Sequence, residues 1–236
     1  MSENKLLLPG GGTPLKLLIK NVTETPEKIL VVGGMSELIA KRLQAKYKVN
    51  VELIVEDFES LLNANLILDY EENIIVKMMD FERTDYEDNF FDLVLAQGTI
   101  SGSNRKKIVK EIKRILKPGG VFAVSEIVKK VESLPPVMNN LMEAAGIVPL
   151  AGGEAEKYYE ERNFEIIEGK DLPEALPEYY KAVQYVFEGR EEELSESEKS
   201  YYKKIIHRIS HEGNVFLKYG GSKYISLKTM IMRLAD

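Results

Sequence analysis

Five short apolar runs alternate with helical patterns between residues 28 and 125, and this alternation restricts the possible folds more than any other feature of the sequence. Each run is rich in valine, isoleucine and leucine and ends at a glycine or a polar residue, which is typical of a buried strand. Strands that alternate with helices form a parallel sheet, covered by helices on both faces and joined by right-handed crossovers. The predicted strands are Lys28–Val32, Val51–Val55, Ile74–Met78, Phe91–Ala96 and Val121–Ser125.

The remainder of the chain completes this sheet and adds a largely helical segment. A sixth strand is predicted at Phe164–Ile167 and a last one at Ser226–Met232, with a loop at Lys170–Pro177. The stretch 171–224 is long for a connection within one sheet, so we expect a helical insertion or lid there. The predicted helices run from Ser36 to Leu43, from Phe58 onwards, and over Asn104–Leu116, Asn139–Ala145, Tyr158–Asn163, Glu178–Phe187 and Ser195–His211. The sequence therefore predicts one α/β domain over 1–236, with a doubly wound, mostly parallel seven-stranded sheet, helices on both faces and a helical insertion before the last strand.

The composition excludes several kinds of protein. The 236 residues include no cysteine, which rules out disulfides and cysteine-ligated metals. The polar start and the lack of a long apolar run predict a cytoplasmic protein with no signal peptide and no membrane partner. The 32 basic and 38 acidic residues give a formal net charge of −6, which disfavours nucleic acid as a partner.

A basic cluster lies within the predicted helix at Asn104–Leu116. Its side chains alternate with apolar ones at helical spacing, which favours a solvated helix face over a nucleic-acid patch. The cluster consists of Arg105, Lys106, Lys107, Lys110, Lys113 and Arg114.

Gly33, Glu56, Asp80 and Gln97 each follow or end a predicted strand. The carboxyl ends of parallel strands meet at one edge of the sheet, and ligands of open α/β sheets bind in the crevice there. We therefore expect these four residues at a ligand site.

Two stretches carry a resemblance to a known family. The first leads from Asp80–Glu82 through Glu87–Val94, and it places an acidic residue and a loop before a strand. The second is Glu111–Phe122, in which Lys117–Gly120 reads Lys-Pro-Gly-Gly between a helix and a strand. In these stretches the chain resembles the class I S-adenosylmethionine-dependent methyltransferases. The resemblance implies a cofactor-binding core at 27–128.

S-adenosylmethionine is the cofactor that the resemblance implies. Glu56 matches the position whose carboxylate accepts hydrogen bonds from the two ribose hydroxyls, and Asp57 beside it is an alternative. Asp80 matches the position that accepts from the adenine amino group, with Phe81 supplying a backbone contact and ring packing. The implied cofactor-binding residues are Gly33, Gly34, Met35, Glu56, Asp57, Asp80, Phe81 and Gln97.

The glycine loop departs from the family pattern. Gly33 is retained, but Val31 replaces an acidic residue, and Met35 and Glu37 stand where further glycines are usual. Side chains at these positions narrow or reshape the space for the ligand. Glu37 has three open roles: it favours the helix dipole, competes with the carboxylate of the cofactor, or replaces the missing acid.

No catalytic residue is predicted, because methyl transfer from a sulfonium needs positioning and desolvation rather than a protein nucleophile. Gln97 is either a neighbour of the methyl acceptor or a strand-end amide that caps nearby backbone. Tyr158, Tyr159, Tyr179 and Tyr180 either line an acceptor pocket or are half-buried packing groups, the more usual role of paired tyrosines on helices.

The N-terminal segment 1–26 contains Leu8–Leu15, which is similar to a Pro-Gly-Gly segment of some family members. It either folds over the cofactor or forms a flexible lead-in. His207 and His211 lie four residues apart, but Glu212 is rotated away from them, so we predict a surface helix and no metal site.

The sequence therefore predicts S-adenosylmethionine-dependent methyl transfer to a small-molecule acceptor. A non-catalytic binding or regulatory protein of the same fold is the alternative, because the glycine loop is altered. A nicotinamide-dependent oxidoreductase is disfavoured, since the loop lacks the three-glycine fingerprint that cradles a pyrophosphate.

Overall fold

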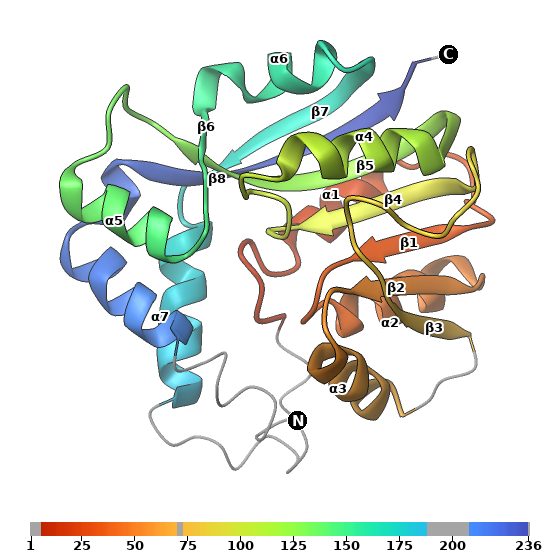
Figure 1. The fold of residues 1–236 in the computed structure, drawn as a ribbon, viewed down its shortest axis with the longest axis horizontal. Helices are drawn as coiled ribbons and strands as arrows, with labels where there is room; N and C mark the ends of the chain where they lie inside the picture. The colour runs from red at the N-terminus through yellow and green to blue at the C-terminus, as the bar shows by residue number, and fades with distance from the viewer. Residues whose placement is uncertain (1–5, 70–72, 188–207, 236) are drawn as a thin grey trace.

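A computed structural model describes residues 6–69, 73–187 and 208–235, and a mixed sheet runs through the centre of this structure (Figure 1). The strand order is β3-β2-β1-β4-β5-β8-β7, and a short strand, β6, pairs with the end of β5. All pairings are parallel except those of β8, which runs antiparallel to β5 and β7. The strands are β1 (Ile29–Val32), β2 (Val51–Val55), β3 (Ile74–Met78), β4 (Phe91–Gln97), β5 (Leu116–Lys129), β6 (Leu150–Ala151), β7 (Phe164–Leu172) and β8 (Ile225–Leu234).

Helices cover both faces of the sheet, as predicted. One face packs against α4 and α6, and the other against α1, α2 and α3. The helices are α1 (Thr13–Asn21), α2 (Glu37–Tyr47), α3 (Phe58–Leu68), α4 (Arg105–Ile115), α5 (Pro136–Ala144), α6 (Ala155–Glu160) and α7 (Ala175–Phe187), and residues 208–218 are also helical.

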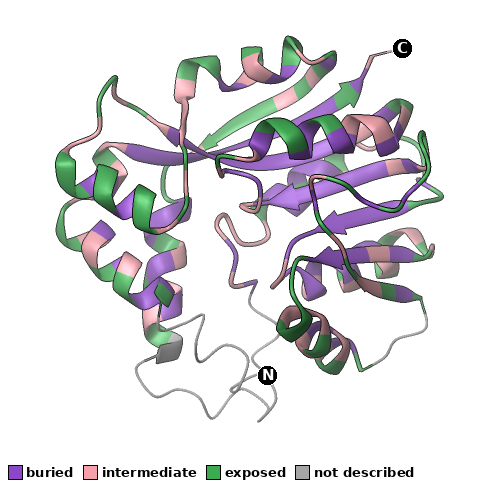
Figure 2. Ribbon diagram, in the orientation of Figure 1, coloured by how far each residue is buried: buried purple, intermediate pink, exposed green. Residues whose placement is uncertain are grey.

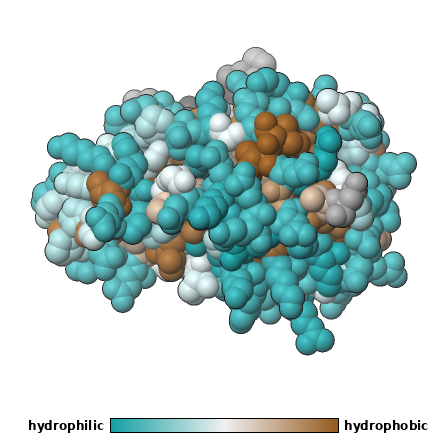
Figure 3. All heavy atoms as spheres, turned by 90° about the horizontal axis from the view of Figure 1, so that it is seen from above, coloured by the Kyte–Doolittle hydropathy of each residue, from teal (hydrophilic) through white to brown (hydrophobic). Residues whose placement is uncertain are grey.

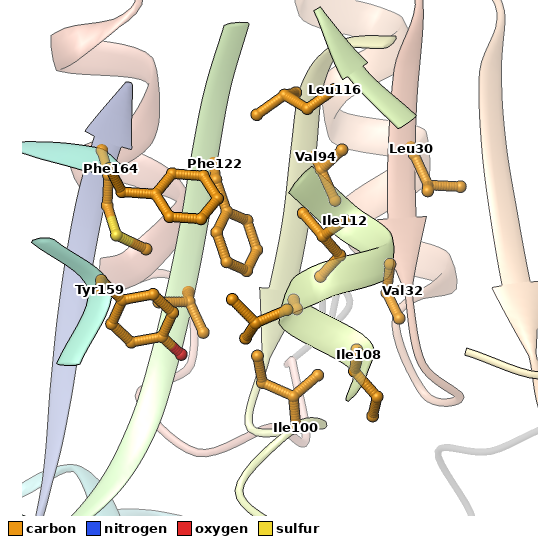
Figure 4. Close-up of a cluster of buried hydrophobic side chains, with 14 of the residues drawn as sticks. Leu30, Val32, Val94, Ile100, Ile108, Ile112, Leu116, Phe122, Tyr159 and Phe164 are labelled. Carbon is orange, nitrogen blue, oxygen red and sulfur yellow. The ribbon is translucent and has the colours of Figure 1, made fainter. Parts of the chain in front are cut away.

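The alternation of side chains along each strand divides the core between the two faces. Leu30 and Val32 of β1 face α4, whereas Ile29 and Val31 face α1 and α2. Figure 4 shows Ile108 and Ile112 of α4 gathered with strand side chains on the first face. Burying each such side chain stabilises the fold by about 1.5–3 kcal/mol. The central strands are accordingly almost wholly buried (Figure 2).

A third apolar cluster lies at the end of the sheet where β5 finishes and β8 begins. It joins α5, α7 and the helical residues 208–218 to Ile127 of β5 and Leu227 of β8. These helices therefore pack beside the carboxyl edge of the parallel strands, on the left of Figure 1. Of them, α7 and residues 208–218 fall within the predicted helical insertion at 171–224, whereas α5 precedes it.

The predicted fold class is confirmed. The differences include α1 and β6, which the sequence pattern did not predict, and several element boundaries. The sheet gains the short strand β6, which is too brief to carry a sequence pattern. The predicted loop Lys170–Pro177 is partly wrong. β7 continues to Leu172, because its last residues pair with β8. Lys117–Gly120 forms no separate turn, since β5 begins at Leu116 and its register against β4 shifts there. His207 and most of the predicted helix Ser195–His211 lie outside the described residues.

Candidate active site

A cavity of about 630 Å³ opens at the carboxyl edge of the parallel strands, and two different walls enclose it. The sheet wall follows β1, β2 and β4 and consists of Gly34, Met35, Glu56, Asp57 and Gln97. The helical wall consists of Leu176, Tyr179, Tyr180, Arg208, Ile209 and Glu212. Between them lie Ser101, Ile127 and Ile147, which we call the floor. The volume suits a small-molecule site.

Glu56 and Asp57 lie next to each other in the sheet wall but have different bonding states. Asp57 caps the N-terminus of α3, where its carboxylate accepts hydrogen bonds from Ser60 N at 2.9 Å and Ser60 Oγ at 2.8 Å. No described residue donates a hydrogen bond to the Glu56 carboxylate. Burial raises its pKa, and the nearby charges of Asp80, Asp57 and Glu82 raise it further. Of the two carboxylates, Glu56 has the free acceptor atoms that a diol requires.

Asp80 and Phe81 lie beside the cavity rather than in its lining. Asp80 is exposed, and one of its carboxylate oxygens accepts a hydrogen bond from Glu82 N at 2.8 Å. The Phe81 ring is 3% exposed and packs in the core between the sheet and α4. The Phe81 ring therefore stabilises the fold, and a contact between its backbone and a ligand stays a prediction.

The glycine loop between β1 and α2 is tightly constrained. Gly33 has φ +113°, and a Cβ atom there would lie 2.3 Å from Oγ1 of Thr99, so only glycine fits. Met35 has φ +62°, a left-handed conformation that costs a residue other than glycine about 1–3 kcal/mol. The loop keeps the backbone path that a glycine would favour, although methionine occupies the position.

Glu37 is buried at the start of α2 with only 1% exposure. Burial raises the pKa of its carboxyl to about 7, although backbone hydrogen bonds from Glu37 and Met35 oppose the rise. Its Oε1 atom is buried without a hydrogen-bond partner, as is Oγ of the adjacent Ser36. The loop therefore contains unsatisfied polar atoms, which are uncommon in folded proteins and often mark a functional site.

Gln97 ties the N-terminal segment to the end of β4. Its Nε2 atom donates to the carbonyl oxygens of Pro9 and Gly11, both at 2.9 Å. Of the two predicted roles of Gln97, these contacts match the strand-end amide that caps nearby backbone. They leave Gln97 Oε1 buried without a hydrogen-bond partner. Leu8 and Pro9 line the cavity, so the described part of the segment packs over the site and is not a loose lead-in.

The two tyrosine pairs have different surroundings. Tyr179 and Tyr180 are in the helical wall. Tyr159 is fully buried on the far side of the floor, and Tyr158 packs under Arg162, whose guanidinium carbon lies 3.6 Å from the ring centroid. Of the two pairs, only Tyr179 and Tyr180 can therefore contact a molecule in the cavity.

A buried ionic cluster supports the floor, and sequence reasoning missed it. Glu126 of β5 is 0% exposed and accepts hydrogen bonds from Ser101 Oγ at 2.5 Å, Arg105 Nε at 2.8 Å and the Tyr159 hydroxyl at 2.5 Å. The prediction that Arg105 belongs to a solvated basic face is wrong, because this side chain turns inward to pair with Glu126. A glutamate within an apolar strand was the available signal.

The rest of the basic cluster lies at the surface or pairs with acids. Lys106, Lys107 and Lys110 are exposed, and Lys107 pairs with Glu82 at 2.7 Å. Arg114 pairs with Glu111 and Asp88. Figure 3 shows a mostly hydrophilic surface on the side of the molecule that is uppermost in Figure 1.

The residues around the sheet wall fit a nucleoside-bearing cofactor. Glu56 supplies free carboxylate oxygens, and the glycine loop brings the backbone to the cavity. The unpaired oxygens of Ser36, Glu37 and Gln97 add polar groups around the loop. The fold and the position of the cavity agree with a class I S-adenosylmethionine-dependent methyltransferase domain.

Comparison with known proteins agrees with this class. Residues 9–124 match the family described as methyltransferase domain, so this part of the chain belongs to that family. A glycine/sarcosine/dimethylglycine N-methyltransferase of Actinopolyspora halophila is 34% identical over 49% of this chain and 21% of its own length. The chain spans less than half the length of the curated relatives it matches.

Two solved structures share the fold over nearly the whole chain. A putative sarcosine dimethylglycine methyltransferase from Galdieria sulphuraria has a TM-score of 0.74 and 19% identity, over 94% of this chain and 83% of its own. A phosphoethanolamine N-methyltransferase of Haemonchus contortus, in complex with phosphomonomethylethanolamine and S-adenosylhomocysteine, has a TM-score of 0.76 and 16% identity, over 99% and 55%. The prediction of an S-adenosylmethionine-dependent methyltransferase domain is confirmed.

Among the described residues, no three His, Asp or Glu side chains gather as a metal site would require. No described helix is long and apolar enough to cross a membrane.

Proposed function

We propose that this chain binds S-adenosylmethionine against the sheet wall and transfers its methyl group to a small molecule held by the helical wall. The observation that carries the proposal is one continuous cavity that joins Glu56, a carboxylate with free acceptor atoms, to a wall of aromatic and apolar side chains. The cavity is partly open, and a cofactor and an acceptor bound together in it would displace water from the reacting centre.

In this proposal, the residues of the chain bind the cofactor and orient the acceptor. Glu56 accepts hydrogen bonds from the ribose hydroxyls, Asp80 accepts from the adenine amino group, and Gly34 and Met35 present their backbone. S-adenosylmethionine supplies a methyl group activated on a sulfonium. The helical wall orients the acceptor and excludes water, so no protein nucleophile is needed.

Isothermal titration calorimetry with S-adenosylmethionine and S-adenosylhomocysteine tests the proposal. We expect micromolar binding of both by the folded protein, and binding weakened by roughly tenfold or more in Glu56→Ala and Asp80→Ala. If a folded sample gives no heat with either ligand, the chain is a non-catalytic protein of this fold. The cytoplasmic location stays a prediction.

A further inference from the structure

The helical wall holds a carboxylate beside two aromatic rings. Glu212, in the helical residues 208–218, and Tyr179 and Tyr180 of α7 line the same cavity. Gly213 permits the close approach of these two helical segments, since a Cβ atom there would lie 2.9 Å from Cδ1 of Tyr180. Backbone packing therefore fixes Glu212 next to the rings.

Among the described residues, Arg208 is the ion-pair partner of the Glu212 carboxylate, at a long distance. Arg208 Nε lies 3.9 Å from Glu212 Oε1, which is too long for a hydrogen bond, and no described residue donates one to this carboxylate. The Arg208 side chain is 73% exposed whereas that of Glu212 is 16% exposed, so solvent screens the cation more than the anion. Burial raises the pKa of Glu212, and a cationic ligand would compensate for that loss of solvation.

The two neighbouring rings are uncharged and pack against each other. Tyr179 and Tyr180 have ring centroids 5.3 Å apart with planes tilted by 49°, and Tyr180 packs on Phe216 at 5.0 Å. Burial raises the pKa of both phenols, so they stay protonated at neutral pH. Aromatic faces attract cations, and sites for ammonium ligands are commonly built from such rings.

We propose that the helical wall binds an amine and that its nitrogen accepts the methyl group, an inference that rests on the proposed function. The other ionisable side chains of the cavity wall favour the same ligand. Arg208 is the only cationic side chain among the described residues that line the cavity, whereas Glu56, Asp57 and Glu212 are all anionic. A strongly anionic acceptor is therefore disfavoured.

The reaction moves a positive charge towards Glu212. The lone pair of the neutral amine forms the new N–C bond, the S–C bond breaks, and its electron pair stays on sulfur. The positive charge passes from sulfonium to nitrogen, and a primary or secondary amine then releases its extra proton to water. Glu212 and the two rings stabilise the ammonium as it forms, which is where binding energy accelerates a reaction.

A pair of isosteres tests the inference by binding alone. Choline and its neutral isostere 3,3-dimethyl-1-butanol are titrated by calorimetry into the wild-type chain, with and without S-adenosylhomocysteine. We expect choline to bind at least roughly tenfold more tightly than the isostere. Glu212→Gln should lose most of that preference, Tyr179→Leu should weaken choline several-fold, and Tyr179→Phe should retain it.

Glu178→Gln is the matched control, because Glu178 is exposed on α7 and does not line the cavity. It should bind choline as the wild type does, and a thermal melt checks that each variant is folded. Equal affinity for the two isosteres, or unchanged choline binding in folded Glu212→Gln, would overturn the inference. Failure of S-adenosylhomocysteine to bind would instead overturn the proposed function, so the two failures are distinguishable.

Discussion

The sheet wall and the helical wall enclose one cavity but are built in different ways. The sheet wall comes from residues 34–97, where strand ends of a parallel sheet meet, and its side chains are mainly polar. The helical wall comes from the described residues 176–180 and 208–212, and it combines two aromatic rings with one carboxylate and one guanidinium. If the proposed function is right, the topology of the sheet determines the cofactor side of the cavity, and the helical insertion determines the acceptor side.

Loss of the buried ion pair beneath the floor should change the free energy of unfolding more than any other substitution proposed below. Arg105→Met leaves Glu126 uncompensated in the core, and we expect a loss of about 3–5 kcal/mol in the free energy of unfolding. Chemical denaturation measures it. Lys106→Met is the control, since Lys106 is exposed and its loss should change stability by about 0.5 kcal/mol or less. Equal effects of the two substitutions would show that the floor is not held by this pair.

Substitution of Glu37 tests whether an ionised carboxylate in the altered glycine loop destabilises the fold. Its pKa is raised to about 7 in the folded protein from an ordinary value of 4.5, so the folded state favours the protonated form. Its contribution to stability is complete below pH 4.5 and is lost as the pH rises through 7. Glu37→Gln should therefore be more stable than the wild type above pH 7, by up to about 3 kcal/mol.

Denaturation of both proteins at several pH values measures this difference. The gap should close as the pH falls towards 4.5. A variant that is less stable than the wild type at every pH would mean that the ionised carboxylate makes favourable contacts in the fold.

Substitutions of Glu56 and Asp57 test which of these two neighbouring carboxylates binds the ligand and which has a structural role. Glu56→Ala should weaken S-adenosylhomocysteine by roughly tenfold to a hundredfold, because hydrogen bonds to a charged acceptor are lost. Asp57→Ala should leave the affinity within a few-fold of the wild type. Calorimetry measures both, and the reverse order of effects would assign the ribose to Asp57.

The capping role of Asp57 predicts the smallest change. Asp57→Ala removes the hydrogen bonds to Ser60 at the start of α3 and should cost about 1 kcal/mol of stability. Thermal unfolding detects it, and Asp57→Asn, which retains a capping acceptor, should recover most of the loss. If neither variant lost stability, α3 would be stable without its cap, which would contradict the prediction.

The sheet wall was predictable from sequence because local patterns determine it. Short apolar runs place the strands, and residues that line the cavity follow directly after some of these runs, as at Gly34 and Glu56. The departure at Met35 and Glu37 was also visible, although its consequence, a buried carboxyl with a raised pKa, depends on packing that no local pattern reveals.

The helical wall was only partly predictable, because its contacts join segments that are distant in sequence. Tyr179 and Tyr180 were candidates, yet nothing local separates them from Tyr158 and Tyr159, which the fold turns away from the cavity. Glu212 drew attention only as a poor neighbour of the histidines. Its position beside the tyrosines depends on the crossing of two helical segments at Gly213.

A crystal structure of the protein with S-adenosylhomocysteine tests the central claim most directly. The account predicts the nucleoside in the cavity between the two walls, with the ribose hydroxyls within hydrogen-bond distance of the Glu56 carboxylate and Asp57 still bonded to Ser60. A nucleoside held elsewhere, such as in the hollow of about 520 Å³ beside residues 21–26 and Arg233, would contradict it.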